Sequence, residues 1–241
     1  MSMLLRFAVG FLLLAQWASA QIAADLGSES HHHLILQNSA VRVYSLALPP
    51  REQSYARHEH NFLLVSLQDG ELVMWREGAS DITSFQLHRG GAGFAFGGKA
   101  QGLRNQTNAT YRGIVVEFLE AGVTTYGYQL SGNWDFGYSG PGAPVDPHGK
   151  FVSALQMGTA MAIDAQLLPG DLLPAGDKAG PELLIPVSDV DLKAAAGGRI
   201  GRRAGDVLWI EAQRAGAYTN AGDQAARFVV IRFSGDRPSG K

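Results

Sequence analysis

The chain has 241 residues, of which 46% are hydrophobic and 17% are charged, and this composition excludes a disordered or low-complexity protein. Twenty basic and 22 acidic residues give a net charge of −2, so no strong positive field is present to hold nucleic acid, which is not an expected partner. Thirty glycines and 10 prolines predict many tight turns and few long helices, which favours an all-β fold.

Residues 1–20 have the pattern of a secretory signal peptide. Arg6 is followed by an apolar run from Phe7 to Ala15, and Ala18-Ser19-Ala20 is a small-residue cleavage pattern before Gln21. An uncleaved membrane anchor is the alternative, but the apolar run is too short to cross about 30 Å of hydrocarbon as a helix. We therefore expect an exported protein, periplasmic or secreted, that has no membrane contact once the leader is removed. It contains no cysteine, so its stability must come from a packed core.

Short apolar runs separated by Gly, Pro and Asn/Asp turns begin near Leu34 and predict an antiparallel sandwich or barrel. The preceding histidines, His31-His32-His33, are interpreted as a surface segment, because adjacent strand residues point alternately and cannot all bind one ion. Gln68-Asp69-Gly70 predicts a hairpin turn between two strands. The predicted strands are Val41 to Leu48, Asn61 to Leu67, Glu71 to Trp75, Ile82 to Leu87, Gly93 to Phe96 and Tyr111 to Leu119.

A His-x-His motif is the most informative feature of the first half of the chain. His58 and His60 flank Glu59, and Gly70 follows ten residues after the second histidine. Strand alternation predicts that both imidazoles point to one face, where they can chelate one metal ion, whereas Glu59 points to the other face. Later residues reproduce the spacing Gly-x5-Pro-x-Gly-x2-His-x3-Asn with two substitutions: Gly90, Phe96, Gly98, Gln101 and Asn105.

Together these two motifs resemble those of the cupin superfamily, over residues 31–119 more clearly than over 151–233. The resemblance implies a jelly-roll barrel whose metal is held by both histidines of the first motif, a Glu four or five residues later, and the His of the second motif. His58 and His60 match, but Leu64 or Val65 stands at the Glu position and Gln101 at the His position. The resemblance therefore implies an incomplete metal site.

The pattern restarts in the second half of the chain. Met161 to Gly170 is similar to Val41 to Pro50 at an offset of 120 residues, and Gly205 and Asn220 match Gly90 and Asn105 at an offset of 115. We expect two tandem antiparallel cupin barrels, a bicupin, with an N-terminal barrel at 31–120, a Gly/Tyr-rich connector at 121–150 and a degenerate C-terminal barrel at 151–233. At the ligand positions the second copy has Lys178, Gly180, Leu184 and Gly216, which predicts no metal site there.

Three functions are compatible with this sequence. In the first, the exported protein binds a small molecule in its N-terminal barrel, and His58, His60 and Gln101 supply hydrogen bonds in an apolar cavity. In the second, it is a metal-dependent enzyme of dioxygenase or isomerase type, in which the same three residues hold one divalent transition metal (Zn, Fe, Cu or Ni) and Glu117 or a water completes the shell. In the third, it is a non-catalytic structural or interaction module. A homodimer is compatible with all three. The predicted cavity residues are Phe62, Leu64, Phe94 and Phe96.

Overall fold

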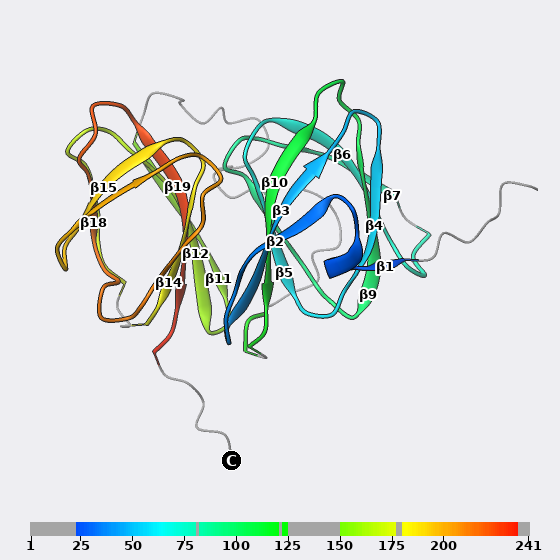
Figure 1. Ribbon diagram of the computed structural model, residues 1–241, viewed down its shortest axis with the longest axis horizontal. Helices are drawn as coiled ribbons and strands as arrows, with labels where there is room; N and C mark the ends of the chain where they lie inside the picture. Colours follow the sequence, from blue (N-terminus) through cyan, green and yellow to red (C-terminus); the bar gives the residue numbers. More distant parts are fainter. Residues whose placement is uncertain (1–22, 81, 121, 125–149, 177–179, 236–241) are drawn as a thin grey trace, which may run out of the picture.

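The computed structural model describes residues 23–80, 82–120, 122–124, 150–176 and 180–235. Within them the chain forms two β barrels that lie side by side (Figure 1). The predicted signal peptide and residues 125–149 of the predicted connector lie outside the described residues. No helix within the described part is both long and apolar enough to span a membrane.

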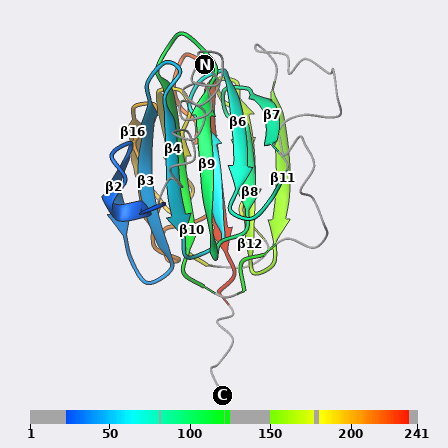
Figure 2. The ribbon, with the colours of Figure 1, turned by 90° about the vertical axis from the view of Figure 1, so that its right-hand side faces the viewer.

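The N-terminal barrel consists of two five-stranded sheets. The outer sheet has the strand order β1-β4-β9-β6-β7 and faces the viewer in Figure 2, and the inner sheet has the order β2-β3-β10-β5-β8. A short 3-10 helix, η2 (Leu26–Ser28), follows β1. The strands are β1 (Ala24–Asp25), β2 (His32–Gln37), β3 (Val41–Leu48), β4 (Gln53–His58), β5 (Phe62–Ser66), β6 (Gly70–Arg76), β7 (Ile82–Leu87), β8 (Ala92–Ala95), β9 (Lys99–Asn105) and β10 (Tyr111–Phe118).

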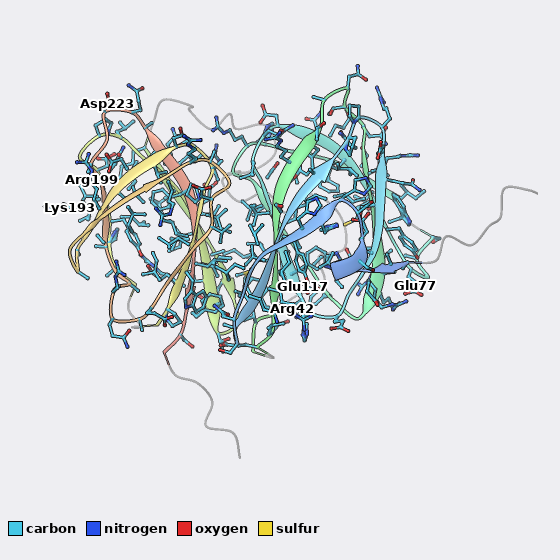
Figure 3. All side chains as sticks on the ribbon, in the orientation of Figure 1. Arg42, Glu77, Glu117, Lys193, Arg199 and Asp223 are labelled. Atoms are coloured by element: carbon cyan, nitrogen blue, oxygen red, sulfur yellow. The ribbon has the colours of Figure 1, made fainter. Side chains whose placement is uncertain are left out.

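The C-terminal barrel repeats this topology. Its inner sheet has the order β11-β12-β19-β14-β17, which matches the inner sheet of the first barrel strand for strand, and its outer sheet has the order β13-β18-β15-β16. Lys193, Arg199 and Asp223 mark the exposed side of this barrel (Figure 3). The strands are β11 (Phe151–Met157), β12 (Ala160–Leu167), β13 (Leu172–Leu173), β14 (Glu182–Pro186), β15 (Val190–Ala194), β16 (Arg199–Arg202), β17 (Leu208–Ile210), β18 (Tyr218–Asn220) and β19 (Ala226–Phe233).

Turn residues at the end of each repeat make the same contacts in both barrels. Gly90 and Gly205 each have φ of 85°, a left-handed conformation that glycine adopts without strain. The Asn105 side chain donates to the Leu48 carbonyl at 3.0 Å, and the Asn220 side chain donates to the Leu167 carbonyl at 2.9 Å. The offset of 115 residues predicted for this part of the repeat is therefore correct.

The offset of 120 predicted for the first strand of the repeat is wrong by one residue. Val41 pairs with Phe118, and Ala160 pairs with Phe233, so that β3 and β12 are equivalent at an offset of 119. β5 and β14 do match at 120, because Leu63 and Leu183 both face the space between the barrels. A shift of one residue exchanges the two faces of a strand, so only the pairing register identifies the equivalent interior positions.

The central strands of the inner sheets are buried on both faces, which explains their continuous apolar sequences. Along β10, Val115 packs inside the first barrel, whereas Ile114, Val116 and Phe118 pack against the second barrel. Phe118 meets Phe233 there, with ring centroids 6.3 Å apart. The two barrels therefore share one hydrophobic core in addition to their separate interiors.

Two predictions about the first barrel need correction. Gln68-Asp69-Gly70 does not close a hairpin, because β5 and β6 belong to different sheets and the turn is a corner between them. β4 and β9 are absent from the predicted strands, because their inward side chains include the polar residues Ser54, His58 and Gln101, so that no apolar alternation marks them. These two neighbouring strands provide the polar part of the site described next.

Candidate ligand-binding cavity

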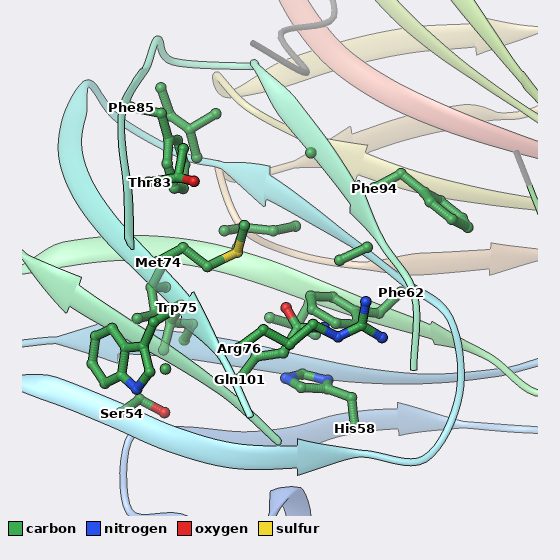
Figure 4. Close-up of a pocket in the computed structure, with 18 of the residues that line it drawn as sticks. Ser54, His58, Phe62, Met74, Trp75, Arg76, Thr83, Phe85, Phe94 and Gln101 are labelled. Carbon is green, nitrogen blue, oxygen red and sulfur yellow. The ribbon is translucent and has the colours of Figure 1, made fainter. Parts of the chain in front are cut away.

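A cavity of about 210 Å³ lies inside the N-terminal barrel, between its two sheets (Figure 4). Most of its wall is apolar, and a few polar side chains gather at one end: His58 from β4, Arg76 from β6 and Gln101 from β9. Such a mixture of apolar wall and few polar groups is typical of small-molecule sites. The main apolar residues are Leu46, Phe62, Leu64, Met74, Phe85 and Val115.

Small residues on β8 leave room for this cavity. Gly93 pairs with Leu64, and Ala95 pairs with Phe62. At the equivalent positions of the second barrel, Leu208 pairs with Leu184, and Ile210 pairs with Glu182. Ile210 is buried in the interior cluster of that barrel, and Leu208 packs against the same cluster. Large side chains in the second barrel therefore occupy the two positions that Gly93 and Ala95 leave open in the first.

His58 is the last residue of β4 and is only 5% exposed. Its ring stacks on Phe62, with centroids 3.8 Å apart and an angle of 16° between the planes. Burial lowers the pKa of His58, and the nearby Glu117 carboxylate opposes this shift without reversing it. The imidazole is therefore neutral at neutral pH, and it offers one donor and one acceptor nitrogen.

Glu117 lies on β10, next to His58. It is 1% exposed, and its Oε1 atom lies 3.5 Å from His58 Nδ1, a distance too long for a good hydrogen bond. Both of these atoms are buried without a hydrogen-bond partner in the structure. Arg42 approaches the other carboxylate oxygen to 4.0 Å (Figure 3). Arg42 also contacts the exposed Glu59 at 3.4 Å. Glu117 is absent from the residues that line the cavity.

His32 is a cavity residue that the sequence interpretation missed. Instead of belonging to a surface segment, it is 7% exposed, lines the cavity, and meets His58 edge to face with centroids 6.2 Å apart. Its Nδ1 lies 2.6 Å from Glu29, which also lies 2.6 Å from Nδ1 of His31. Burial raises the pKa of Glu29, but the hydrogen bonds with His32 and His31 outweigh burial and lower it to about 2. The sequence around His32 does not indicate that this residue is buried, because its burial depends on η2 and β4, which pack against it.

Arg76 and Gln101 are cross-strand neighbours on β6 and β9 and converge on the same carbonyl. Arg76 Nη2 donates to Phe96 O at 3.2 Å and to Gly97 O at 3.3 Å, and Gln101 Nε2 donates to Phe96 O at 2.9 Å. Arg76 was not among the predicted site residues, although Leu72, Met74 and Arg76 alternate along one strand and share the inward face. That alternation is the signal that would have identified it.

His60 does not share a face with His58, contrary to the prediction. β4 ends at His58, whose carbonyl accepts from Gly98 N at 2.8 Å, and the chain bends at residues 59–60 to enter the other sheet. A bend cancels the strand alternation on which the prediction depended, and His60 is not among the residues that line the cavity. Within the described part of the chain, no three His, Cys, Asp or Glu side chains are placed to hold a metal ion. The donors therefore do not fit the transition-metal site that the resemblance implied.

The four predicted cavity residues divide into two pairs. All four border the cavity, and Phe62 and Leu64 belong to the interior cluster of the first barrel. Phe94 belongs to the core between the barrels, with its ring centroid 6.3 Å from that of Phe118, and Phe96 packs against that core. The ring of Phe94 points away from the cavity in Figure 4. The side chains of Phe94 and Phe96 therefore lie on the opposite face of the chain from Gly93 and Ala95, toward the core between the barrels.

A closed polar cluster occupies the corresponding end of the second barrel. Arg232 stands where the first barrel has Glu117, and its Nε atom donates to Glu182 at 2.8 Å. The Tyr218 hydroxyl donates to the other oxygen of the Glu182 carboxylate. Burial and the adjacent carboxylate raise the pKa of Tyr218, which stays protonated. Of the four predicted ligand positions in this repeat, Lys178 lies outside the described residues, and Gly180, Leu184 and Gly216 have no side chain that binds a metal.

Solved structures with the same architecture cover most of the chain. A cupin 2 conserved barrel domain protein from Leptotrichia buccalis has a TM-score of 0.54 at 11% identity, over 88% of this chain and 92% of that chain. Procruciferin, an 11S globulin from Brassica napus, has a TM-score of 0.57 at 12% identity, over 82% and 78%. An oxalate decarboxylase has a TM-score of 0.52 at 13% identity, over 85% and 76%. No protein-family model and no curated protein sequence matches the chain. At these identities the likeness shows the fold alone, and the chain has a bicupin fold, with two tandem jelly-roll barrels.

Proposed function

We propose that this protein binds a small organic molecule in the cavity of its N-terminal barrel. The observation that carries the proposal is the contrast between the two copies of the fold: Gly93 and Ala95 leave a cavity in the first barrel, where Leu208 and Ile210 fill the second. Filling an interior stabilises a protein, so a cavity kept in one of two equivalent barrels favours a role in binding.

The size of the cavity limits the ligand. An apolar cavity of about 150 Å³ accepts benzene, so a cavity of about 210 Å³ suits a molecule with one ring or a short aliphatic chain. The apolar wall would supply most of the affinity, and His58, Arg76 and Gln101 would fix the orientation at the polar end.

A fragment screen by ligand-observed NMR tests this proposal on the full mature chain. Ala95→Ile is the blocked variant, because it places in the first barrel the residue that fills the second. Arg104→Gln is the matched control, since Arg104 is exposed on the outer side of β9. We expect fragments that bind the wild type and Arg104→Gln but not Ala95→Ile. If no fragment distinguishes Ala95→Ile from the wild type, the cavity is not a binding site.

The metal-dependent alternative has its own test. Elemental analysis of protein purified without a His tag should show no metal in stoichiometric amount, because His60 is not among the residues that line the cavity, where His58 and Gln101 lie. One metal per chain, lost in the His58→Ala/His60→Ala double variant, would instead favour a metal-dependent enzyme. The fold does not decide between these functions, since the similar structures include both a decarboxylase and an 11S globulin.

Export is a separate part of the proposal and depends on residues 1–20 alone. We infer that the mature protein starts at Gln21, after the small-residue pattern Ala18-Ser19-Ala20. N-terminal sequencing of the protein recovered outside the cytoplasm should begin at Gln21. Recovery of the intact N-terminus would contradict cleavage.

A further inference from the structure

Arg76 carries the only fixed charge among the described residues that line the cavity. The lining set contains no Asp, Glu or Lys side chain, and its two histidines are His32 and His58. Glu77, which follows Arg76 in the chain, forms its ion pair with Arg57 instead. Glu117 pairs with Arg42 and His58 and lies outside the lining set. The positive charge of Arg76 therefore has no negative partner within the described part of the chain.

The hydrogen bonds of Arg76 are also incomplete. Its Nη2 atom is held by the carbonyls of Phe96 and Gly97, which fixes the guanidinium plane before any ligand arrives. Its Nε atom is buried and has no hydrogen-bond partner. A buried donor on a charged group without an acceptor costs free energy, and this cost is removed when an anionic acceptor binds.

The surroundings of Arg76 favour a carboxylate as that acceptor. A guanidinium matches the planar carboxylate group, and hydrogen bonds between two charged groups are about twice as strong as neutral ones. Gln101 and the neutral His58 lie beside Arg76 at the same end of the cavity, so a carboxylate there would meet uncharged polar groups in the lining (Figure 4). The Glu117 carboxylate lies 3.5 Å from His58 but outside the lining. Most of the remaining lining is apolar, and its other polar side chains, His32, Ser54, Thr83 and Gln86, include no carboxylate.

We propose that the ligand of the N-terminal barrel is a small monocarboxylate with an apolar body, and that Arg76 binds its carboxylate group. This inference rests on the proposed function and specifies its ligand class. The guanidinium of Arg76 would pair with the carboxylate, and the ring or aliphatic chain would lie along Leu64, Met74 and Phe85.

The experiment compares three acids with their primary amides on the full mature chain by isothermal titration calorimetry at pH 7.5. The pairs are benzoate and benzamide, phenylacetate and phenylacetamide, and hexanoate and hexanamide, which have similar shapes within each pair but differ in charge. We expect at least one acid to bind about tenfold or more tightly than its amide, because both can accept a hydrogen bond from Arg76 but only the acid also supplies a negative charge to pair with the guanidinium. Equal affinities within all three pairs would overturn the carboxylate assignment, and this comparison needs no variant.

The variants then locate the effect. Arg76→Gln should weaken the acid about tenfold or more and should leave the amide within about threefold, whereas Arg104→Gln removes the same charge from the exposed side of β9 and should change neither. Acid affinity that is unchanged in folded Arg76→Gln would overturn the role of Arg76. If acids and amides bind equally and Ala95→Ile blocks both, the proposed function stands and this inference fails. If none of the six compounds binds, the carboxylate assignment fails, and the fragment screen decides the proposed function separately.

Discussion

Replacing Ala95 by isoleucine should stabilise the protein, because the side chain would enter the cavity. Ala95 lies on β8 and borders the cavity, and the equivalent residue of the second barrel is Ile210, which is 6% exposed. Three added carbons, each worth about 0.8 kcal/mol when buried, give at most about 2.4 kcal/mol. Ordering an isoleucine side chain costs about 0.5–1 kcal/mol, so the net gain should be about 1.5 kcal/mol.

The reciprocal change provides the control for this calculation. Ile210→Ala removes the same three carbons from a filled interior and should lower the free energy of unfolding by about 2–5 kcal/mol. Both variants can be measured by urea denaturation at 25 °C, with tryptophan fluorescence as the signal. If Ala95→Ile instead lowers the free energy of unfolding by more than about 1 kcal/mol, the side chain is overpacked. The first barrel would then have no usable cavity, and the reasoning behind the proposed function would be wrong.

Two further predictions concern charged groups. The pKa of Glu29, at about 2, lies below the ordinary 4.5, so its ionised form stabilises the fold above pH 4.5 and this contribution is lost as the pH falls from 4.5 towards 2. Glu29→Gln should therefore lower the free energy of unfolding by about 1–3 kcal/mol at pH 6 and by progressively less at lower pH. Urea titrations at several pH values measure this, and a stability difference between the variant and the wild type that does not vary with pH would contradict the prediction. Arg232→Met leaves the Glu182 carboxylate buried without its cation and should cost about 3–5 kcal/mol, whereas the double variant Arg232→Met/Glu182→Leu should recover at least half of that loss. A single variant within about 1 kcal/mol of the wild type would show that this ion pair does not stabilise the second barrel.

The fold could be predicted because it follows from local sequence patterns, which depend little on distant parts of the chain. Apolar runs, turn glycines and the repeated Gly and Asn positions predicted an all-β chain with two tandem cupin barrels, and the strand orders of the inner sheets confirm this fold. Gly90 was informative because its positive φ is a property of a single turn, and Asn105 because its side chain bonds within its own turn, to Ala109 O, as well as to Leu48 O at the end of β3. The register of β3 against β12 was misjudged, because a one-residue difference in a connection leaves the apolar pattern nearly unchanged.

The candidate site was only partly predictable. Motif spacing identified His58 and Gln101, and the structure places both beside the cavity. His60 was assigned to the same face because alternation was extended past the end of β4, where the chain bends between sheets. His32 and Arg76 were missed, because their place in the cavity depends on how strands from different parts of the chain pack together.

The sequence by itself therefore determined the β architecture, the duplication and part of the polar site, because these follow from residue periodicity and turn chemistry. Only the tertiary structure decided which barrel is hollow, since that depends on the pairing of Gly93 and Ala95 with Leu64 and Phe62 across β5 and β8. It also decided that Arg76 lies in that cavity without a negative partner in the described part of the chain. Volume and charge compensation depend on all the neighbours of a residue, and most of those neighbours are distant in the sequence.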